Sequence, residues 1–347
     1  MRVFGSGSVT PLTRTMSVCG VALLGLGLLT TGVAAAGVSA DGAPCTRTIR
    51  SVADARAALP AAVPGDMLCF VGADLADVDL TMTRSGTTNA PISLVSDGHT
   101  VVHQFHILAD HVVIQGFTIT GGGELLLAGT GIVAQKNTIR NTQRGGIVCA
   151  SCIDSALQSN TVTHVATTGI YLSGQRITVR ENLVIATVPA GGPADAGDAD
   201  GVRFFGNGHR IISNVIQDIS AGARSAHPDC FQTFDAGRPA TFDVEIVGNA
   251  CRNVGENCLI ATGDESGKSA APAGSRSITF LGNTCVTNGD QAVSLRHWPG
   301  VEVRKNKLLG PNLKRGVVLT RGSTGCIVQD NTTARGVPAV EIDSSSR

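Results

Sequence analysis

Aromatic residues and net charge are both scarce in this sequence. Phe, Tyr and Trp make up 3% of its 347 residues, so a core must be filled mainly by Val, Ile, Leu and Ala. The 27 basic residues balance the 27 acidic ones and are dispersed, whereas a nucleic-acid-binding protein needs a concentrated cationic face. Paired C-x-x-C motifs and Cys/His clusters are absent, so a zinc site is not expected. No linker divides the chain, which favours a single domain.

Asparagine, by contrast, recurs in a regular context. Eight asparagines each follow an apolar, β-branched stretch, at intervals of 22 to 35 residues. A repeat of 22 to 25 residues that lengthens in selected turns is typical of a solenoid with inserted loops. The eight residues are Asn137, Asn160, Asn182, Asn214, Asn249, Asn283, Asn306 and Asn331.

The stretches before these asparagines alternate between apolar and polar residues, as in residues 177–182 and 278–283. This period of two indicates strands rather than helices. A second set of strand-like segments keeps a roughly constant offset from the first, and each begins with a small residue, as in 201–204. Two short strands per coil, with coils stacked about 4.8 Å apart, predict a parallel β-helix. The asparagines should then form an internal ladder whose amides bond between coils.

The first 40 residues have the pattern of a secretory signal. Arg2 and Arg14 precede an apolar stretch from about residue 16 to 36, and Val38-Ser39-Ala40 offers a small-x-small cleavage site. An uncleaved membrane anchor is the alternative, since the stretch approaches the roughly 20 residues that a span needs. We therefore expect a signal peptide at 1–40, a secreted β-helix domain at 41–347, and no membrane span after processing.

Nine cysteines follow the signal, and export makes disulfide bonds plausible. Cys251 and Cys285 each lie two positions after a ladder asparagine, so they should stack on successive coils. Cys230 and Cys258 should stack likewise at the start of the other strand. Each stack predicts a bridge between coils or, for Cys230 and Cys258, two buried thiols that act as small apolar side chains. The other expected pairs are Cys45 with Cys69 and Cys149 with Cys152, and Cys326 is left over.

A family resemblance lies in the segment before the ladder. Residues 51–59 read as a short helix, Pro64-Gly65-Asp66 leads into a strand, and an SGT…API segment at 85–92 leads into the next coil. This order resembles the start of secreted pectate-lyase-like β-helix proteins, especially chondroitinase-B-like and alginate-lyase-like polysaccharide lyases. The resemblance implies an all-β, single-domain, right-handed parallel β-helix. The short N-terminal helix would close the open end of the solenoid.

Three consecutive intervals, 182–214, 214–249 and 249–283, are longer than the others. Their inserted loops should rise together on one flank and border a groove for a linear ligand. Charged and amide groups beside stacked aromatic rings would suit a sugar chain, and loops without a function are the alternative. The strands beneath the loops predict three columns: Asp200, Asp229 and Asn257; Arg203, Gln232 and Ile260; and Phe205, Phe234 and Thr262, followed by Arg296. From these columns, Asp200, Gln232, Phe205, Phe234 and Arg296 are predicted to bind substrate.

Residues 226–235 hold the densest group of reactive side chains. His227 could act as a base that Asp229 holds in place. Arg203 and Lys268 could neutralise a uronate and stabilise the enolate of a β-elimination. The structural alternatives are a strand cap for Asp229 and a solvated loop position for His227.

Calcium is a further candidate ligand. Asp264 and Glu265 follow one coil later and could supply a second acid or bind calcium through their carboxylates. Chondroitinase-B-like lyases use a Lys and an Arg beside acidic calcium ligands, and this resemblance points to Lys268 and Arg296. An exposed turn at 264–268 is the alternative.

These residues leave three functions open for a monomeric protein with a polysaccharide partner. The leading prediction is a polysaccharide lyase that acts by β-elimination on a uronate-containing polymer. A glycoside hydrolase is the second, and it needs two carboxylates about 5 to 5.5 Å or 6.5 to 9.5 Å apart, for which Asp200 and Asp229 are the candidates. The third is a surface protein that binds glycans without catalysis.

Overall fold

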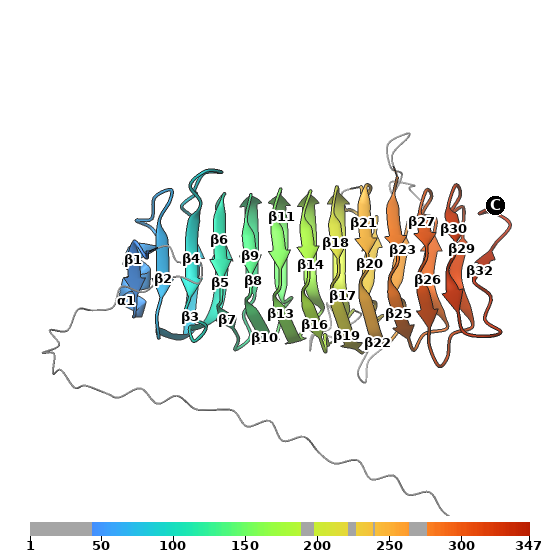
Figure 1. Cartoon of the computed structure of the whole chain (residues 1–347), viewed down its shortest axis with the longest axis horizontal. Helices are drawn as coiled ribbons and strands as arrows, with labels where there is room; N and C mark the ends of the chain where they lie inside the picture. Colours follow the sequence, from blue (N-terminus) through green and yellow to red (C-terminus); the bar gives the residue numbers. More distant parts are fainter. Residues whose placement is uncertain (1–43, 189–197, 221–226, 239, 264–275) are drawn as a thin grey trace, which may run out of the picture. The chain divides into compact units, whose positions relative to one another are not determined.

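The computed structural model describes residues 44–188, 198–220, 227–238, 240–263 and 276–347. Within these residues the strands follow one another along a single axis (Figure 1). They form a sheet of 12 strands and a sheet of 20 strands, and the pairs between named strands are parallel. The protein is therefore a right-handed parallel β-helix, as the sequence predicts.

Each regular coil contributes three strands, so the prediction of two strands per coil was wrong. The first series precedes the ladder asparagines and forms the 12-stranded sheet. The missed series is the one that directly follows them, where strands of only two to five residues leave little room for an alternating pattern to show. The first series comprises β1 (Arg47–Ile49), β2 (Met67–Phe70), β4 (Ile92–Ser96), β6 (Val112–Gln115), β9 (Val133–Gln135), β12 (Ala156–Gln158), β15 (Thr178–Arg180), β18 (Arg210–Ile212), β21 (Val244–Val247), β24 (Ile278–Leu281), β27 (Glu302–Arg304) and β30 (Ile327–Gln329).

The 20-stranded sheet holds the second and third series, joined at its N-terminal end by the long strands β3 (Asp74–Met82) and β5 (Val101–Ile107). The second series comprises β7 (Thr118–Ile119), β10 (Thr138–Thr142), β13 (Thr161–Val165), β16 (Leu183–Ile185), β19 (Val215–Ile219), β22 (Ala250–Val254), β25 (Thr284–Thr287), β28 (Lys307–Leu309) and β31 (Thr332–Thr333). The third comprises β8 (Leu125–Thr130), β11 (Ile147–Ile153), β14 (Thr168–Gln175), β17 (Asp200–Asn207), β20 (Phe231–Phe234), β23 (Leu259–Thr262), β26 (Gln291–Arg296), β29 (Arg315–Thr320) and β32 (Val340–Ile342).

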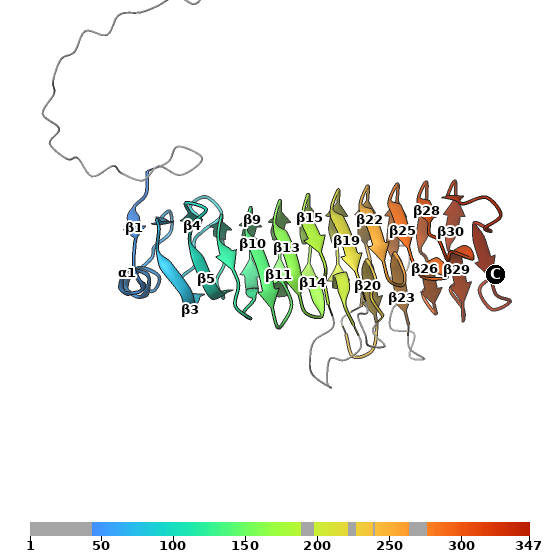
Figure 2. The same ribbon diagram turned by 90° about the horizontal axis from the view of Figure 1, so that it is seen from below.

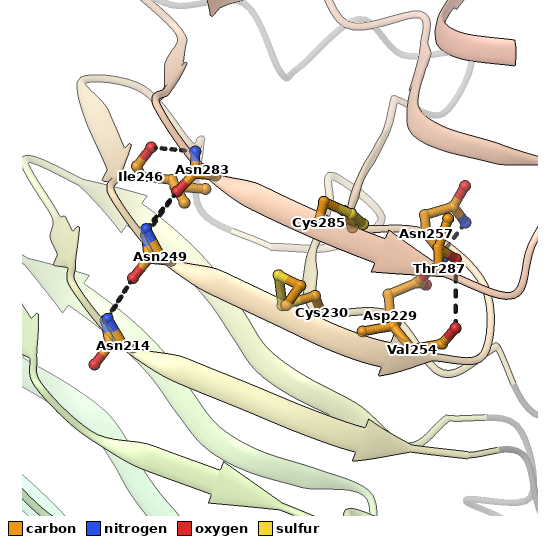
Figure 3. The surroundings of a disulfide bond; sticks show 12 residues. Asn214, Asp229, Cys230, Ile246, Asn249, Val254, Asn257, Asn283, Cys285 and Thr287 are labelled. Atoms are coloured by element: carbon orange, nitrogen blue, oxygen red, sulfur yellow. Dashed lines mark hydrogen bonds between the residues drawn. A yellow bond between two sulfur atoms is a disulfide. The ribbon is translucent and has the colours of Figure 1, made fainter. Parts of the chain in front are cut away.

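The asparagine ladder is present along its whole predicted length. In each step the backbone N–H and the Nδ2 group of one asparagine donate to the Oδ1 atom of the next, as from Asn214 to Asn249 at 2.8 and 2.9 Å. Asn249 continues to Asn283 in the same way (Figure 3). The residue before each ladder asparagine has a positive φ, such as 57° at Glu181 and 65° at Gly248. This left-handed residue turns the chain so that the following amide points inward.

The core is more aromatic than the composition suggested. Trp298 and seven phenylalanines, among them Phe231 and Phe280, are fully buried. At the N-terminal end lies the predicted helix, α1 (Val52–Ala58), beside β1 (Figure 1). The Ser51 hydroxyl caps it by accepting a hydrogen bond from the Asp54 N–H, and Ala55 and Ala58 face the core. No helix among the described residues is long and apolar enough to cross a membrane.

Four disulfide bonds are present, and two correct the predicted pairing. Cys45–Cys69 and Cys149–Cys152 form as expected. Cys251 and Cys285 do stack in register on adjacent strands, but they do not bond to each other. Cys230 bonds to Cys251 and Cys258 bonds to Cys285, each pair with its Cα atoms 6.1 Å apart. Both bonds thus cross the interior, from the start of a third-series strand to the second-series strand of the following coil, instead of joining residues stacked in register.

The neighbouring coils explain this pairing. A Cβ atom added to Gly146, Gly169 or Gly201 would collide with Val162, Val184 and Ile216, respectively. The first position of the third series therefore faces the second-series strand of the following coil across the interior. Where those three positions hold glycine opposite a β-branched residue, Cys230 and Cys258 lie opposite Cys251 and Cys285. Cys326 is the one free cysteine among the described residues.

Candidate functional site

The third series presents its outward side chains in one row over the enlarged coils. β14, β17, β20, β23 and β26 pair in that order, and all but β17 are labelled in Figure 2. The strand register aligns Tyr171 with Arg203, Arg203 with Gln232, and Gln232 with Ile260. It also aligns Phe234 with Thr262 and Thr262 with Arg296, so the predicted columns are in place. We call the outer face of β14, β17, β20, β23 and β26 the site face.

An aromatic and cationic cluster occupies the part of the site face formed by β14, β17 and β20. The ring of Phe205 contacts Tyr171 and Phe234, with centroids 5.7 and 4.9 Å apart. The Arg238 guanidinium lies over Phe205 at 5.0 Å and donates a hydrogen bond of 3.2 Å to the Tyr171 hydroxyl. Phe205 is fully buried beneath these neighbours, whereas Phe234 is half-buried and Arg238 is exposed. Phe234 and Arg238 can therefore contact a ligand, and Phe205 supports them.

Arg203 lies next to this cluster and is held by two carboxylates. Its Nε atom donates to Asp200 Oδ2 at 2.9 Å, and its Nη2 atom donates to Asp198 Oδ2 at 2.7 Å. The Arg203 side chain is 15% exposed, that of Asp198 is 31% exposed, and that of Asp200 is fully buried. The guanidinium is thus fixed on the site face by a carboxylate below it and another beside it.

Beneath the site face, Asp200 and Asp229 continue as a column that ends in Asn257. The Asp229 N–H donates to Asp200 Oδ1 at 3.1 Å, and the Asn257 N–H and Nδ2 groups donate to Asp229 Oδ1 at 2.7 and 2.9 Å. Both carboxyl groups are 0% exposed. Asp229 precedes Cys230 and Asn257 precedes Cys258, so the two disulfides that cross the interior fix the backbone beside the column (Figure 3).

Burial dominates the ionisation of this pair. It raises the pKa of Asp200 to about 7; the Arg203 guanidinium opposes this rise and the Asp198 charge adds to it. Burial also raises the pKa of Asp229 well above its ordinary range, and the neighbouring charge of Asp200 adds to the effect. A single guanidinium therefore faces three carboxyl groups, of which two are withdrawn from water.

Two amide oxygens next to the pair have no hydrogen-bond partner. Gln232 approaches Asp229 Oδ2 with its Nε2 group at 3.4 Å, while its own Oε1 atom is buried and unpaired. The Oδ1 atom of Asn257 is also buried and unpaired. Gln232 and Asn257 are only 8% and 6% exposed, and unpaired polar atoms are rare at such depth.

The remaining predicted residues take no part in the cluster or the acid column. His227 is exposed, and no hydrogen bond joins it to Asp229 in the described structure, because the Asp229 carboxyl points inward to Asn257 and Gln232. Arg296 is exposed on the site face. Lys268, Asp264 and Glu265 lie outside the described residues. Among those that are described, no group of three or more His, Cys, Asp or Glu could hold a metal ion.

Sequence reasoning missed three residues of the cluster. Tyr171 could have been found, because it is the only tyrosine and occupies the position of Arg203 on the preceding coil. Asp198 lies two residues before Asp200 but inside a segment that reads as an inserted loop. Arg238 belongs to the loop after β20, and no sequence pattern indicates that it folds back over two coils to Tyr171.

No protein-family model and no curated protein matches this sequence. Among solved structures, the chain is similar to an alginate lyase from Paenibacillus sp., with 15% identity over 86% of this chain and 100% of that chain, and a TM-score of 0.45. It is also similar to pectate lyase Pel9A, with 14% identity over 89% and 80% of the two chains and a TM-score of 0.40. A thermostable α-1,3-glucanase from Streptomyces thermodiastaticus has 15% identity over 89% and 69%, with a TM-score of 0.46. The fold that the N-terminal segment led us to expect is confirmed by the strand arrangement itself, and function must be argued from the side chains.

Proposed function

We propose that this protein is a polysaccharide lyase that binds a uronate-containing polymer along the site face and cleaves it by β-elimination. The observation that carries the proposal is the position of Arg238, which is exposed over the rings of Phe205 and Phe234. No carboxylate among the described residues pairs with it. A guanidinium beside a half-buried aromatic ring suits a sugar that carries a carboxylate.

The same surface offers further contacts for such a polymer. Arg296 is exposed two strands from Phe234 on the site face, and no described carboxylate pairs with it either. Arg203 and Gln232 lie side by side between the two ends of the face. Cations spaced along the site face can therefore pair with carboxylates on different sugars of one chain.

The chemistry requires removal of the proton next to the uronate carboxylate and departure of the glycosidic oxygen across the adjacent bond. We assign the carboxylate to Arg238, with Arg203, whose charge Asp198 and Asp200 already offset, as a hydrogen-bond donor to the developing enolate. We assign proton abstraction to the phenolate form of Tyr171, whose oxygen accepts a hydrogen bond from Arg238. His227 is exposed in the segment before β20, and we propose that it donates a proton to the departing glycosidic oxygen. Lys268 stays a candidate for a further cation.

Hydrolysis by paired carboxylates agrees less well with the site. Asp200 and Asp229, the pair expected for a hydrolase, are both fully buried. The Oδ1 atoms of both, and the Asp200 Oδ2 atom, already accept hydrogen bonds from the protein. Among Asp198, Asp200 and Asp229, only Asp198 reaches the surface, and its carboxylate already accepts a hydrogen bond from Arg203.

The test is a screen of the protein against polygalacturonate, alginate and neutral glucans, with ultraviolet absorbance and new reducing ends measured in parallel. A lyase gives both signals on a uronate polymer, because elimination creates a conjugated double bond. Reducing ends without absorbance would identify a hydrolase, and binding without products would identify a glycan-binding protein.

On a polymer that the protein cleaves, Tyr171→Phe should lower kcat by about 10²- to 10⁴-fold, as expected for loss of a proton-transfer group. Arg238→Ala should raise KM about tenfold or more, which corresponds to a loss of about 1.4 kcal/mol. Arg210→Ala is the matched control, because Arg210 is exposed on the first series and pairs with Glu245. Full activity of Tyr171→Phe would rule out the assigned base.

We further propose that residues 1–40 are a signal peptide and that the β-helix at 41–347 acts outside the cell. Four disulfide bonds support this location, because such bonds persist in oxidising compartments. Mass spectrometry of the exported protein would locate the cleavage site, and a mature chain that begins at Met1 would contradict the proposal.

A further inference from the structure

The buried pair of Asp200 and Asp229 cannot carry two charges at low cost. Asp200 has a cation, because Arg203 donates to it through Nε and Nη2. The hydrogen-bond partners of the Asp229 carboxyl group are all neutral, since they are Asn257 and Gln232. An ionised carboxylate without a cation in the interior is strongly unfavourable, so one proton is expected in the pair.

The hydrogen bonds indicate which oxygen holds that proton. Both oxygens of Asp200 accept N–H groups, from Asp229 and Arg203. The Oδ1 atom of Asp229 accepts two N–H groups from Asn257. The Asp229 Oδ2 atom has only a long contact of 3.4 Å to the Gln232 amide, so it has room for a proton.

A proton on this oxygen also changes which atom of Gln232 is left unpaired. The nitrogen and oxygen of an amide occupy nearly the same space, and their assignment follows from the hydrogen bonds. If the Asp229 hydroxyl donates to Gln232 Oε1, the amide turns and its NH₂ group takes the buried position that now has no partner. Gln232 lies in register with Arg203 on the adjacent strand. After the turn, the end of its side chain that faces away from Asp229 would be a hydrogen-bond donor instead of an acceptor.

We propose that Asp229 holds the single proton of the buried pair, and that this proton turns Gln232 to present its NH₂ group to an anionic sugar. Asp229 is thus a positioning residue for the proposed substrate, and the inference rests on the proposed function for the identity of the ligand. The raised pKa of both acids agrees with a shared proton. Loss of the proton would draw the NH₂ group back to the carboxylate and add a negative charge beneath the site face.

The charged and titratable groups around the pair are few among the described residues. Asp198 and Arg203 approach from β17 and the segment before it. Tyr171 lies behind Arg203 on β14. His227 and Glu256 precede the two column residues Asp229 and Asn257, and both are exposed. Asp235, which directly follows β20, is buried as well, so the comparison of wild type with Asp229→Asn is what assigns a pH dependence of binding to the pair.

The test compares two substitutions of the same kind. In Asp229→Asn the new NH₂ group takes the place of the protonated oxygen and donates to Gln232, so binding is retained. In Asp200→Asn an NH₂ group meets N–H donors on either side, so Arg203 loses its anchor. Affinity for polygalacturonate and alginate is measured from pH 5 to 9, where the sugar carboxylates stay ionised, and carboxyl-reduced polygalacturonate is the neutral control.

Wild-type affinity for the uronate polymers should fall about tenfold or more as the pH rises, whereas Asp229→Asn should bind with a nearly constant affinity. Asp200→Asn and Gln232→Glu should bind weakly throughout. Infrared difference spectra supply a readout that needs no ligand, since the band of a protonated carboxyl group should be present in the wild type and lost in Asp229→Asn.

The outcomes separate the two proposals. An infrared band without binding to any polymer would support the assigned proton and contradict the proposed function. Binding of uronate polymers with no such band, and with the same pH profile in wild type and Asp229→Asn, would overturn the inference. Equal binding by Asp200→Asn and Asp229→Asn would overturn it as well.

Discussion

Two columns of polar side chains run inside this β-helix, one made of amides and one made mainly of acids. The asparagine ladder spans Asn137 to Asn331 and repeats the same bonds at each step. The acid column has three members, Asp200, Asp229 and Asn257, and lies under the enlarged coils. An amide both donates and accepts, so it can pair with identical neighbours above and below. A carboxylate only accepts, so its column needs a guanidinium and a proton.

This difference separates stability from function within one architecture. The ladder is neutral, repeats the same hydrogen bonds at every step and leaves no side-chain atom of its buried members unpaired. The acid column is short, charged and leaves the Gln232 and Asn257 oxygens unpaired. Such departures from a locally consistent pattern are expected where a protein meets a ligand. Exchanging residues between the two columns should therefore have opposite effects.

The largest effect is expected when an acid enters the ladder. Asn249→Asp keeps the shape but removes the donor to Ile211 O and Asn283 Oδ1, with no cation nearby in the ladder. The acid should remain protonated in the native state and ionise on unfolding. Stability should therefore fall as pH rises above about 4, by up to roughly 4 kcal/mol at pH 7.

Chemical denaturation at pH 4 and pH 7 measures this loss. Asn249→Leu is the matched control, since it should cost about 2 to 4 kcal/mol at both pH values by leaving buried partners unpaired. A pH-independent stability of Asn249→Asp, or an unchanged melting temperature of Asn249→Leu, would show that the ladder is not what holds these coils.

The opposite exchange should stabilise the protein. Because the pKa of Asp229 is raised, the native state keeps a proton that the unfolded chain loses above about pH 4, so wild-type stability falls as pH rises from there. Asp229→Asn removes this pH-dependent loss of stability, because the amide does not ionise. At pH 8 the variant should be more stable than the wild type by on the order of 1 kcal/mol or more, and near pH 4 the two should be alike. A variant less stable than the wild type at pH 8 would contradict a raised pKa of Asp229 in the folded protein.

The smallest effect is expected at the last ladder position. Asn331 is only half-buried, and its Oδ1 atom accepts from Asn306 where water can reach. Asn331→Leu should cost less than about 1 kcal/mol, because water can replace part of the lost bonding. A loss as large as that of Asn249→Leu would show that bonding along the ladder, rather than burial, sets the contribution of each step.

The sequence predicted the fold well because the β-helix repeats a local rule. Each ladder asparagine follows a strand and a left-handed residue, so the period and the first series could be read directly. The second series was missed because its strands are short. The paired cysteines were visible, but their partners were not, because the same four positions allow either stacking in register or bonding across the interior. Comparison with glycine and β-branched residues at those positions would have resolved it.

The site was predictable only as far as the register extends. The columns of Asp200, Arg203 and Phe205 were found because strand alignment fixes them. Burial was not, since the alternation of a strand cannot show that Phe205 and Asp229 are covered. The contact of Arg238 with Tyr171 arises from a loop that folds back over two coils. Such loop positions depend on tertiary packing and leave no periodic signal.

The two disulfides that cross the interior also bear on when the site is complete. Cys230 and Cys258 directly follow Asp229 and Asn257, so oxidation fixes the chain at the two positions where the acid column is assembled. A chain still in a reducing compartment would lack these two fixed points. We expect protein refolded with its thiols reduced to keep its strand content but to bind uronate polymers weakly until it is oxidised. Assembly of the acid column would then depend on an oxidising environment, which the proposed export would supply.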